Sequence, residues 1–154
     1  MFGGGDLELS KILLLKGKPQ AALDAFGENR TEQRRLYVAA LALHDLGRSE
    51  ESAAAIALIL ESSAPRIHWT IAKVYAWTGQ IDAAFDAIYK AAELDQSSSE
   101  DEVVRWSIQG ISARSRDPVF RRLHGDPRWQ EFLEKYGISA EQLADLQFTV
   151  TLPE

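Results

Sequence analysis

Three stretches of the chain read GKPQAALDAF from Gly17, GRSEESAAAI from Gly47 and GQIDAAFDAI from Gly79. The three glycines are 30 and 32 residues apart, and each stands between two segments with helical periodicity. Five positions after each glycine comes a small residue, and four positions later a bulky apolar one. The small residues are Ala22, Ser52 and Ala84, and the bulky ones are Phe26, Ile56 and Ile88. This recurrence predicts an internal repeat.

The residue types at these positions are the ones that a pair of antiparallel helices requires. Glycine suits the point where the backbone leaves the first helix in a left-handed conformation. Small residues allow the two helices to cross closely, and bulky ones fill the space toward the next pair. Because one such hairpin cannot bury its own apolar face, neighbouring hairpins must stack. The sequence therefore predicts an all-α fold of helix hairpins, over residues 6–29, 31–63 and 65–95.

The repeat resembles the tetratricopeptide repeat (TPR), whose pattern is W-x₂-L-G-x₂-Y…A-x₃-F…P. The alanine and phenylalanine of that pattern are present as Ala22 and Phe26, and conservatively as Ala84 and Ile88. The third repeat matches best, through Ala72, Tyr75, Gly79, Ala84, Ile88 and Ala91. The resemblance covers residues 6–95 and implies a right-handed α-solenoid of three TPR-like hairpins.

The repeats also depart from the family pattern. The opening tryptophan is replaced by Leu36 in the second repeat and by His68 in the third. The closing proline is missing or displaced, with Pro65 following the second repeat, and the repeats are shorter than the nominal period. Chaperone-binding arrays of this family use paired lysines and asparagines on the first helices. These helices contain no asparagine here, so binding of chaperone tails is not expected.

Residues 96–154 are predicted to cap the last repeat with further helices. Two capping boxes and two Asp-Pro pairs mark helix starts, since aspartate suits the N-cap and proline the first helical position. The capping boxes are Ser99 with Glu102 and Ser139 with Gln142, and the pairs are Asp117-Pro118 and Asp126-Pro127. Helix ends are expected at Gly125 and Gly137. Residues 148–152 alternate in polarity, which predicts a short strand or an extended tail.

One phrase of this tail resembles the closing segment of a group of bacterial multi-domain regulators. The phrase is Asp126-Pro127-Arg128-Trp129, followed by Phe132-Leu133. In that group, winged-helix transcription activators or nucleotide cyclases carry a TPR array as their sensing or docking part. No part of this chain resembles their catalytic or DNA-binding half. The resemblance implies an array without its effector, and whether the chain is a piece of a longer protein stays open.

The composition narrows the classes of function. The 154 residues carry a net charge of −6 with a pI near 5.1, which argues against nucleic acid as the main partner. The chain has no cysteine, which excludes disulfides and thiolate metal sites. It has no signal peptide and no run of 18 apolar residues, so no membrane insertion is expected. We expect a cytoplasmic location, with the periplasm as an alternative if the array belongs to a membrane-anchored regulator.

The first helices of successive hairpins are expected to line a concave groove. Aligning the repeats on their glycines gives four rows, which are Leu7, Tyr37 and Trp69; Lys11, Leu41 and Lys73; Leu14, His44 and Ala76; and Leu15, Asp45 and Trp77. Two arginines precede these rows by one turn. The candidate partner-binding residues are Lys11, Arg34, Tyr37, His44, Arg66, Trp69, Lys73 and Trp77. An aromatic and basic groove on an acidic protein suits an acidic or C-terminal peptide with an apolar anchor.

Structural explanations of the same residues stay open. The aromatic residues at helical spacing are equally suited to packing between helices, and the lysines to a solvated face. The three histidines have neither metal-ligand spacing nor cysteine partners, and no Ser/His/Asp arrangement or phosphate-binding loop is present. No cofactor, no metal and no enzymatic activity are therefore predicted.

Three hypotheses for the function follow. The first is a binding module that holds a peptide or partner protein in the groove. The second is an assembly element, in which the apolar first helix mediates self-association or continues a larger array. Its apolar residues are Leu7, Leu9, Ile12, Leu13, Leu14 and Leu15. The third is the sensory end of a transcription regulator or nucleotide cyclase, with a small molecule as its ligand.

Overall fold

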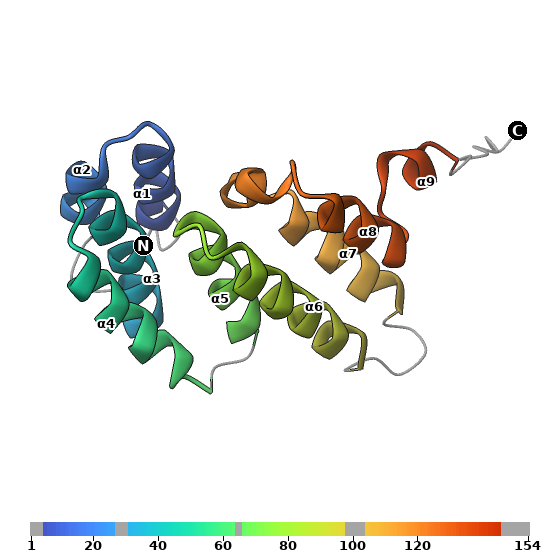
Figure 1. Ribbon diagram of the computed structural model, residues 1–154, viewed down its shortest axis with the longest axis horizontal. Helices are drawn as coiled ribbons and strands as arrows, with labels where there is room; N and C mark the ends of the chain where they lie inside the picture. Colours follow the sequence, from blue (N-terminus) through green and yellow to red (C-terminus); the bar gives the residue numbers. More distant parts are fainter. Residues whose placement is uncertain (1–4, 27–30, 64–65, 98–103, 146–154) are drawn as a thin grey trace, which may run out of the picture. The chain divides into compact units, whose positions relative to one another are not determined.

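The computed structural model describes residues 5–26, 31–63, 66–97 and 104–145. Two of the predicted features lie outside these residues: the capping box of Ser99 with Glu102 and the extended tail at 148–152. The helices in chain order are α1 (Gly5–Leu15), α2 (Pro19–Ala25), α3 (Glu32–Asp45), α4 (Ser49–Leu60), α5 (Ile67–Trp77), α6 (Ile81–Ser97), α7 (Val104–Ser115), the 3₁₀ helix η1 (Pro118–Leu123), α8 (Pro127–Lys135) and α9 (Ala140–Ala144) (Figure 1). The described residues contain no strand, and the predicted all-α class is confirmed.

The chain divides into two compact units, Met1–Ala91 and Ala92–Glu154, with the boundary inside α6. Unit 1 contains the helices α1 to α5 and most of α6. Unit 2 contains the end of α6 and the helices that follow it. Each unit is described by itself below.

The turns between the paired helices of unit 1 have the predicted left-handed glycines. Gly17, Gly47 and Gly79 have φ values of 68°, 74° and 79°. In each turn the amide after the glycine donates to a carbonyl five residues back, at 2.9 Å. The donor and acceptor residues are Lys18 and Leu13, Arg48 and Leu43, and Gln80 and Tyr75. This hydrogen bond is the mark of a Schellman motif, which ends a helix and reverses the chain.

Small buried residues lie where the helices of each hairpin cross. Ala22, Ser52 and Ala84 are all buried, as predicted. In the first two hairpins each of these residues faces a second small residue twelve positions earlier in the chain, and in the third hairpin Ala72, also buried, occupies that position. In the first hairpin the hydroxyl of Ser10 donates to the carbonyl of Ala22 at 3.0 Å. In the second the direction is reversed, since the hydroxyl of Ser52 donates to the carbonyl of Ala40 at 2.7 Å.

The hairpins of unit 1 pack in chain order. Contacts join α1 to α2 and α3 to α4 within hairpins, and α2 to α3 and α4 to α5 between them. The first helices also contact one another, α1 with α3 and α3 with α5 (Figure 1). The side chains between these helices form the core, including Val38, Leu41, Ile59, Val74 and Ile88. Of the three predicted bulky residues, Ile88 is fully buried, whereas Phe26 and Ile56 are half-buried. The arrangement is that of a helical-repeat-like all-α protein.

Helix caps in unit 2 follow the sequence prediction. The carboxylate of Asp117 accepts from the amide of Val119 at 3.1 Å, and that of Asp126 from the amide of Arg128 at 3.0 Å. The first cap opens a 3₁₀ helix and the second an α-helix. The capping box predicted at Ser139 and Gln142 is present at the start of α9, with both of its hydrogen bonds. Gly137 ends α8 with a φ of 68°, also as predicted.

A chain of aromatic rings forms the core of unit 2. Phe120 of η1 lies 5.8 Å from Trp129 of α8, measured between ring centroids. Trp129 lies 5.9 Å from Phe132, which lies 5.0 Å from Tyr136. All four rings are buried. The phrase Asp126-Pro127-Arg128-Trp129 is therefore a helix start whose aspartate caps the helix and whose tryptophan enters this core.

The left-handed turn at Gly47 yields a stability prediction. A Cβ at this position meets no atom within 4 Å, so Gly47→Ala tests the backbone conformation alone. We expect a loss of about 1 kcal/mol in the free energy of unfolding, because L-residues other than glycine are strained at positive φ. Urea unfolding followed by circular dichroism measures it. The control is Gly125→Ala, where the space is equally open and φ is not positive. An equal loss in both variants would contradict the prediction.

Candidate functional site

The first helices of the three hairpins form a pocket in unit 1, with a volume of about 430 Å³. α1, α3 and α5 each contribute side chains to its wall, together with the residue that precedes α3. The lining residues are Leu7, Thr31, Gln33, Arg34, Tyr37, Thr70 and Lys73. Three of the eight predicted partner-binding residues, Arg34, Tyr37 and Lys73, are thus brought together in one pocket.

The stacking of the repeats explains why these residues meet. Residues at the same distance from the turn glycine hold equivalent positions in first helices that contact one another, α1 with α3 and α3 with α5. Leu7 and Tyr37 occupy one such position, ten residues before Gly17 and Gly47. Arg34 precedes Tyr37 by one helical turn, and Lys73 follows its row by one turn, so side chains converge from neighbouring helices.

The lining residues give the pocket a definite chemistry. Arg34 and Lys73 supply two positive charges, and no lining residue is a carboxylate. Two threonines and one glutamine supply further hydrogen-bonding groups, while Leu7 and the small exposed part of Tyr37, which is 6% exposed, supply apolar surface. Such a wall attracts a carboxylate and accommodates an adjacent apolar side chain.

The two tryptophans of the predicted groove are buried instead of lining this pocket. Trp69 is 4% exposed and Trp77 is 7% exposed. The indole Nε1–H of Trp77 donates to Oδ1 of Asp45 at 3.0 Å, which joins the last residue of α5 to the last residue of α3. Asp45 and Trp77 therefore form a contact between α3 and α5, and packing is the role that burial favours for both indoles.

The remaining candidates lie on the same helices but do not line the pocket. Lys11 is half-buried on α1, and its ammonium lies 3.6 Å from a carboxylate oxygen of Glu8. His44 is half-buried in the last turn of α3. Arg66 is exposed and caps the start of α5 with a left-handed backbone, φ 62°. A non-glycine residue in that conformation stores a small strain at the entry to the third hairpin.

Three lining residues were missed by the sequence reasoning: Thr31, Gln33 and Thr70. Gln33 directly precedes Arg34, and Thr70 lies one turn before Lys73, so their positions beside predicted residues were the available signal. Alignment on the glycines identifies rows of equivalent residues. It does not show which of the side chains beside a row face the pocket.

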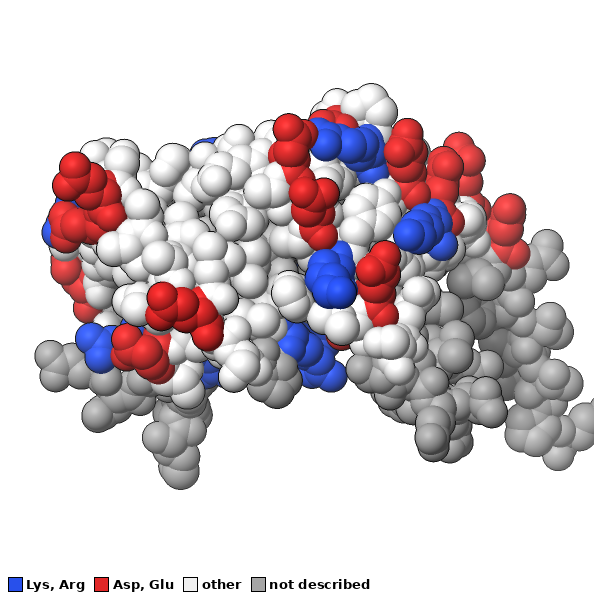
Figure 2. Space-filling view, turned by 60° about the horizontal axis from the view of Figure 1, so that its bottom comes forward, with Lys and Arg blue, Asp and Glu red and all other residues white. Residues whose placement is uncertain are grey.

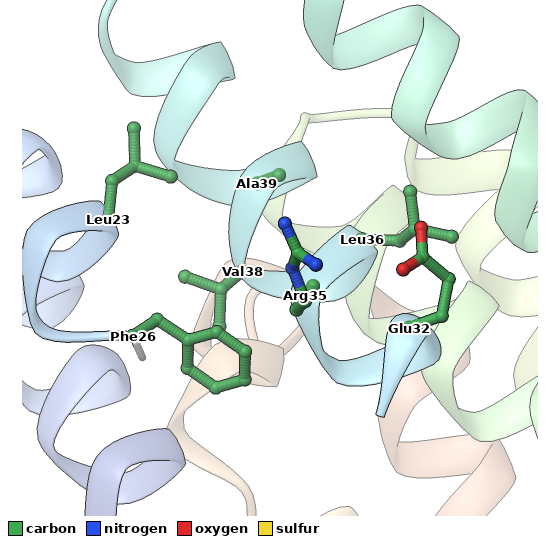
Figure 3. Close-up of a pocket in the computed structure, with 7 residues that line it drawn as sticks. All are labelled: Leu23, Phe26, Glu32, Arg35, Leu36, Val38 and Ala39. Atoms are coloured by element: carbon green, nitrogen blue, oxygen red, sulfur yellow. The ribbon is translucent and has the colours of Figure 1, made fainter. Parts of the chain in front are cut away.

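A second, smaller pocket of about 250 Å³ lies between α2 and α3. Figure 3 shows Leu23 and Phe26 on one side of it and side chains of α3 on the other. The α3 residues that line it are Glu32, Arg35, Leu36, Val38 and Ala39. Its wall is mainly apolar, with one acidic and one basic side chain. The pocket lies between the first hairpin and the second, where the half-buried side chain of Phe26 does not fill all of the space.

Several charged side chains outside the pocket form ion pairs with one another. Figure 2 shows one face of the molecule, on which acidic and basic side chains lie beside one another in several places, with uncharged surface between these charged areas. The guanidinium of Arg48 holds both oxygens of Glu51 at 2.6–2.7 Å at the start of α4, and this pairing lowers the pKa of that carboxyl. The guanidinium of Arg128 pairs with Asp126 and lowers its pKa in the same way.

His124 is held against the aromatic core of unit 2. Its ring stacks on Trp129 with 4.8 Å between centroids. The residue is exposed overall, but the partial burial of its ring, and secondly the charge of Arg121, lower the pKa of the imidazole below its ordinary value. As the sequence indicated, His124 ends one helix, and Asp126 caps the next.

No family model, no curated protein and no solved structure matches the chain. Among the described residues, no group of three or more His, Cys, Asp or Glu side chains is placed to hold a metal ion. No helix within the described part of the chain has the length and apolar character needed to cross a membrane.

The hydrogen bond between Trp77 and Asp45 yields a second stability prediction. We expect Trp77→Phe to lower the free energy of unfolding by about 1–2 kcal/mol, since it removes a partly buried bond to a carboxylate. A double-mutant cycle with Asp45→Ala isolates the pair, and the expected coupling is about 1 kcal/mol. Strictly additive effects would show that the two groups do not support each other.

The environment of His124 yields a pH prediction. Its pKa is lower in the folded chain than in the unfolded chain, so the unfolded chain takes up the proton first. The contribution to stability is full above the unfolded value of about 6.5 and is lost as the pH falls through the folded value. An NMR titration of the imidazole should give a midpoint below that measured in urea. His124→Gln should reduce the loss of stability between about pH 7.5 and 5. Equal midpoints in the two states would refute this assignment.

Proposed function

We propose that the chain is a non-catalytic protein–protein interaction module. In this proposal the three hairpins form a right-handed, TPR-like α-solenoid, and the pocket between α1, α3 and α5 is part of its concave groove. The observation that carries the proposal is the convergence of Arg34, Tyr37 and Lys73 on one pocket. The contacts of each first helix with the next one support a groove that runs across the repeats.

The lining side chains favour a peptide with a carboxylate beside an apolar anchor. The two cations attract the carboxylate, and the hydroxyl and amide groups are suited to the backbone of an extended peptide. Leu7 and Tyr37 offer the anchor an apolar surface that is already held by the helices. A volume of about 430 Å³ lies within the ordinary range of ligand pockets and holds one or two side chains of the peptide.

The proposal assigns different roles to the predicted groove residues. Arg34 and Lys73 contact the peptide directly, and Tyr37, which is only 6% exposed, contributes the part of its side chain that lines the pocket. Trp69 and Trp77 hold the first helices in register, since both indoles are buried. The wall of the pocket is therefore set on rigid elements, which lowers the entropy cost of binding.

The test uses peptides selected for binding from a library of random peptides with free C-termini. The affinity of a selected peptide is measured by fluorescence anisotropy for the parent chain and for Lys73→Glu. We expect Lys73→Glu to weaken binding at least about tenfold, because it replaces attraction to the peptide carboxylate with repulsion. The parent affinity should also fall as the salt concentration rises.

The matched control is Lys90→Glu. Lys90 is exposed on α6, lies outside the set of pocket-lining residues and has the same charge as Lys73. Both variants change the net charge equally, so any general electrostatic effect is the same in both. If the two variants bind the peptide equally well, or if the library yields no binder, the assignment of the pocket is wrong.

A further inference from the structure

The exposed side chains of α1 form a stripe with internal symmetry. Between residues 7 and 16, five side chains are exposed, and the others are half-buried or buried. The exposed ones are Glu8, Leu9, Ile12, Leu15 and Lys16. At helical spacing they lie on one face, centred on Ile12. The three apolar members are 47%, 47% and 42% exposed, and because they are adjacent at helical spacing they form a contiguous apolar patch.

The third hairpin buries the equivalent face of its first helix. The residues of α5 at the positions of Leu9, Ile12 and Leu15 are Ile71, Val74 and Trp77. They are only 8%, 1% and 7% exposed, and α5 contacts both helices of the preceding hairpin. Trp77 reaches back to Asp45 of α3. The stripe on α1 is thus equivalent to the face of α5 that packs against the preceding hairpin. Its exposed centre on α1 consists of apolar side chains.

The order of residues along the stripe indicates that a second copy of α1 can pack against it. A two-fold axis through Ile12 places Leu9 opposite Leu15, because each is three residues from the centre. The same axis places Glu8 opposite Lys16, each four residues from the centre. Two antiparallel copies of α1 therefore bring like apolar groups together and unlike charges together. Such self-complementarity is what a two-fold, isologous interface requires.

We propose that α1 mediates dimerisation of the chain by antiparallel packing against α1 of a second copy. The apolar side chains at 9, 12 and 15 form the centre of the interface. Glu8 and the second copy's Lys16 form an ion pair at each end. The helix is about 16 Å long, so the contact is small, and we expect a weak dimer with a Kd of roughly 10–100 µM. This proposal is independent of the peptide-binding pocket.

The first test measures the mass of the full chain in solution by sedimentation equilibrium, over about 5–500 µM. The parent should shift from monomer to dimer, and Ile12→Glu should stay monomeric over the whole range. Leu58→Glu is the control, because Leu58 is 52% exposed on α4, outside the stripe, and should leave the dimer intact. Circular dichroism shows that each variant is folded. A monomeric parent at 500 µM, or a dimer that survives Ile12→Glu, overturns the proposal.

The second test reverses the charges at the ends of the stripe. Glu8→Lys or Lys16→Glu alone places like charges opposite each other in both halves of the dimer, and each should weaken it at least about tenfold. The double variant Glu8→Lys/Lys16→Glu should restore the parent affinity. An equimolar mixture of the two single variants should form mixed dimers. Failure of the double variant to restore the dimer overturns the antiparallel register, and Lys73→Glu should leave the dimer unchanged.

Discussion

The close crossing of paired helices is the constraint on which unit 1 depends. In each hairpin, two buried small residues stand twelve positions apart with a left-handed glycine between them, and in the first two hairpins a hydrogen bond joins the two residues across the helices. The turn fixes the direction of the second helix, and the crossing fixes its distance from the first. Together they determine which residues face the next hairpin, since every other contact of the unit is made by helices already held in pairs.

The pocket and the stripe on α1 both follow from this arrangement. Successive first helices lie side by side, so residues from different repeats meet across their faces. On one side of these helices, Arg34, Tyr37 and Lys73 are among the residues that line a pocket. The face that α5 buries against an earlier hairpin is exposed on α1, which has no earlier hairpin among the described residues. The same repeat unit thus produces two surfaces of different chemistry.

Sequence reasoning reached the features that depend on local signals. The glycine turns, the aspartate caps and the capping box at Ser139 were predictable because each is fixed by neighbouring residues in the chain. The partner of Ala22 was not predicted, since Ser10 lies in an apolar helix and nothing in its own sequence context indicates a bond twelve residues away. Leu14 and Leu15 are adjacent and chemically equal, yet one is buried and the other exposed.

The candidate site was predictable only as rows of residues. Repeat alignment identified the helices that meet and the residues that share a position. The rotation of each helix about its axis determines whether a given side chain lines the pocket or packs against a neighbouring helix. That rotation depends on the whole core. Trp69 shares its repeat position with Tyr37, but Tyr37 lines the pocket and Trp69 does not. A repeat pattern assigns both residues to the same position and therefore does not distinguish their roles.

The hydrogen bonds of Ser10 and Ser52 run in opposite directions between the two helices of their hairpins. This difference has a consequence for how the sequences of the repeats can diverge. In the first hairpin the hydroxyl comes from the first helix, in the second hairpin it comes from the second helix, and the third hairpin has Ala72 and Ala84 with no hydroxyl at all. All three combinations of residues are compatible with the hairpin, because the positions require small side chains and not a hydroxyl donor on a particular helix. Serine and alanine are therefore exchangeable there, and repeats of common origin can diverge in sequence while their backbones keep the same geometry.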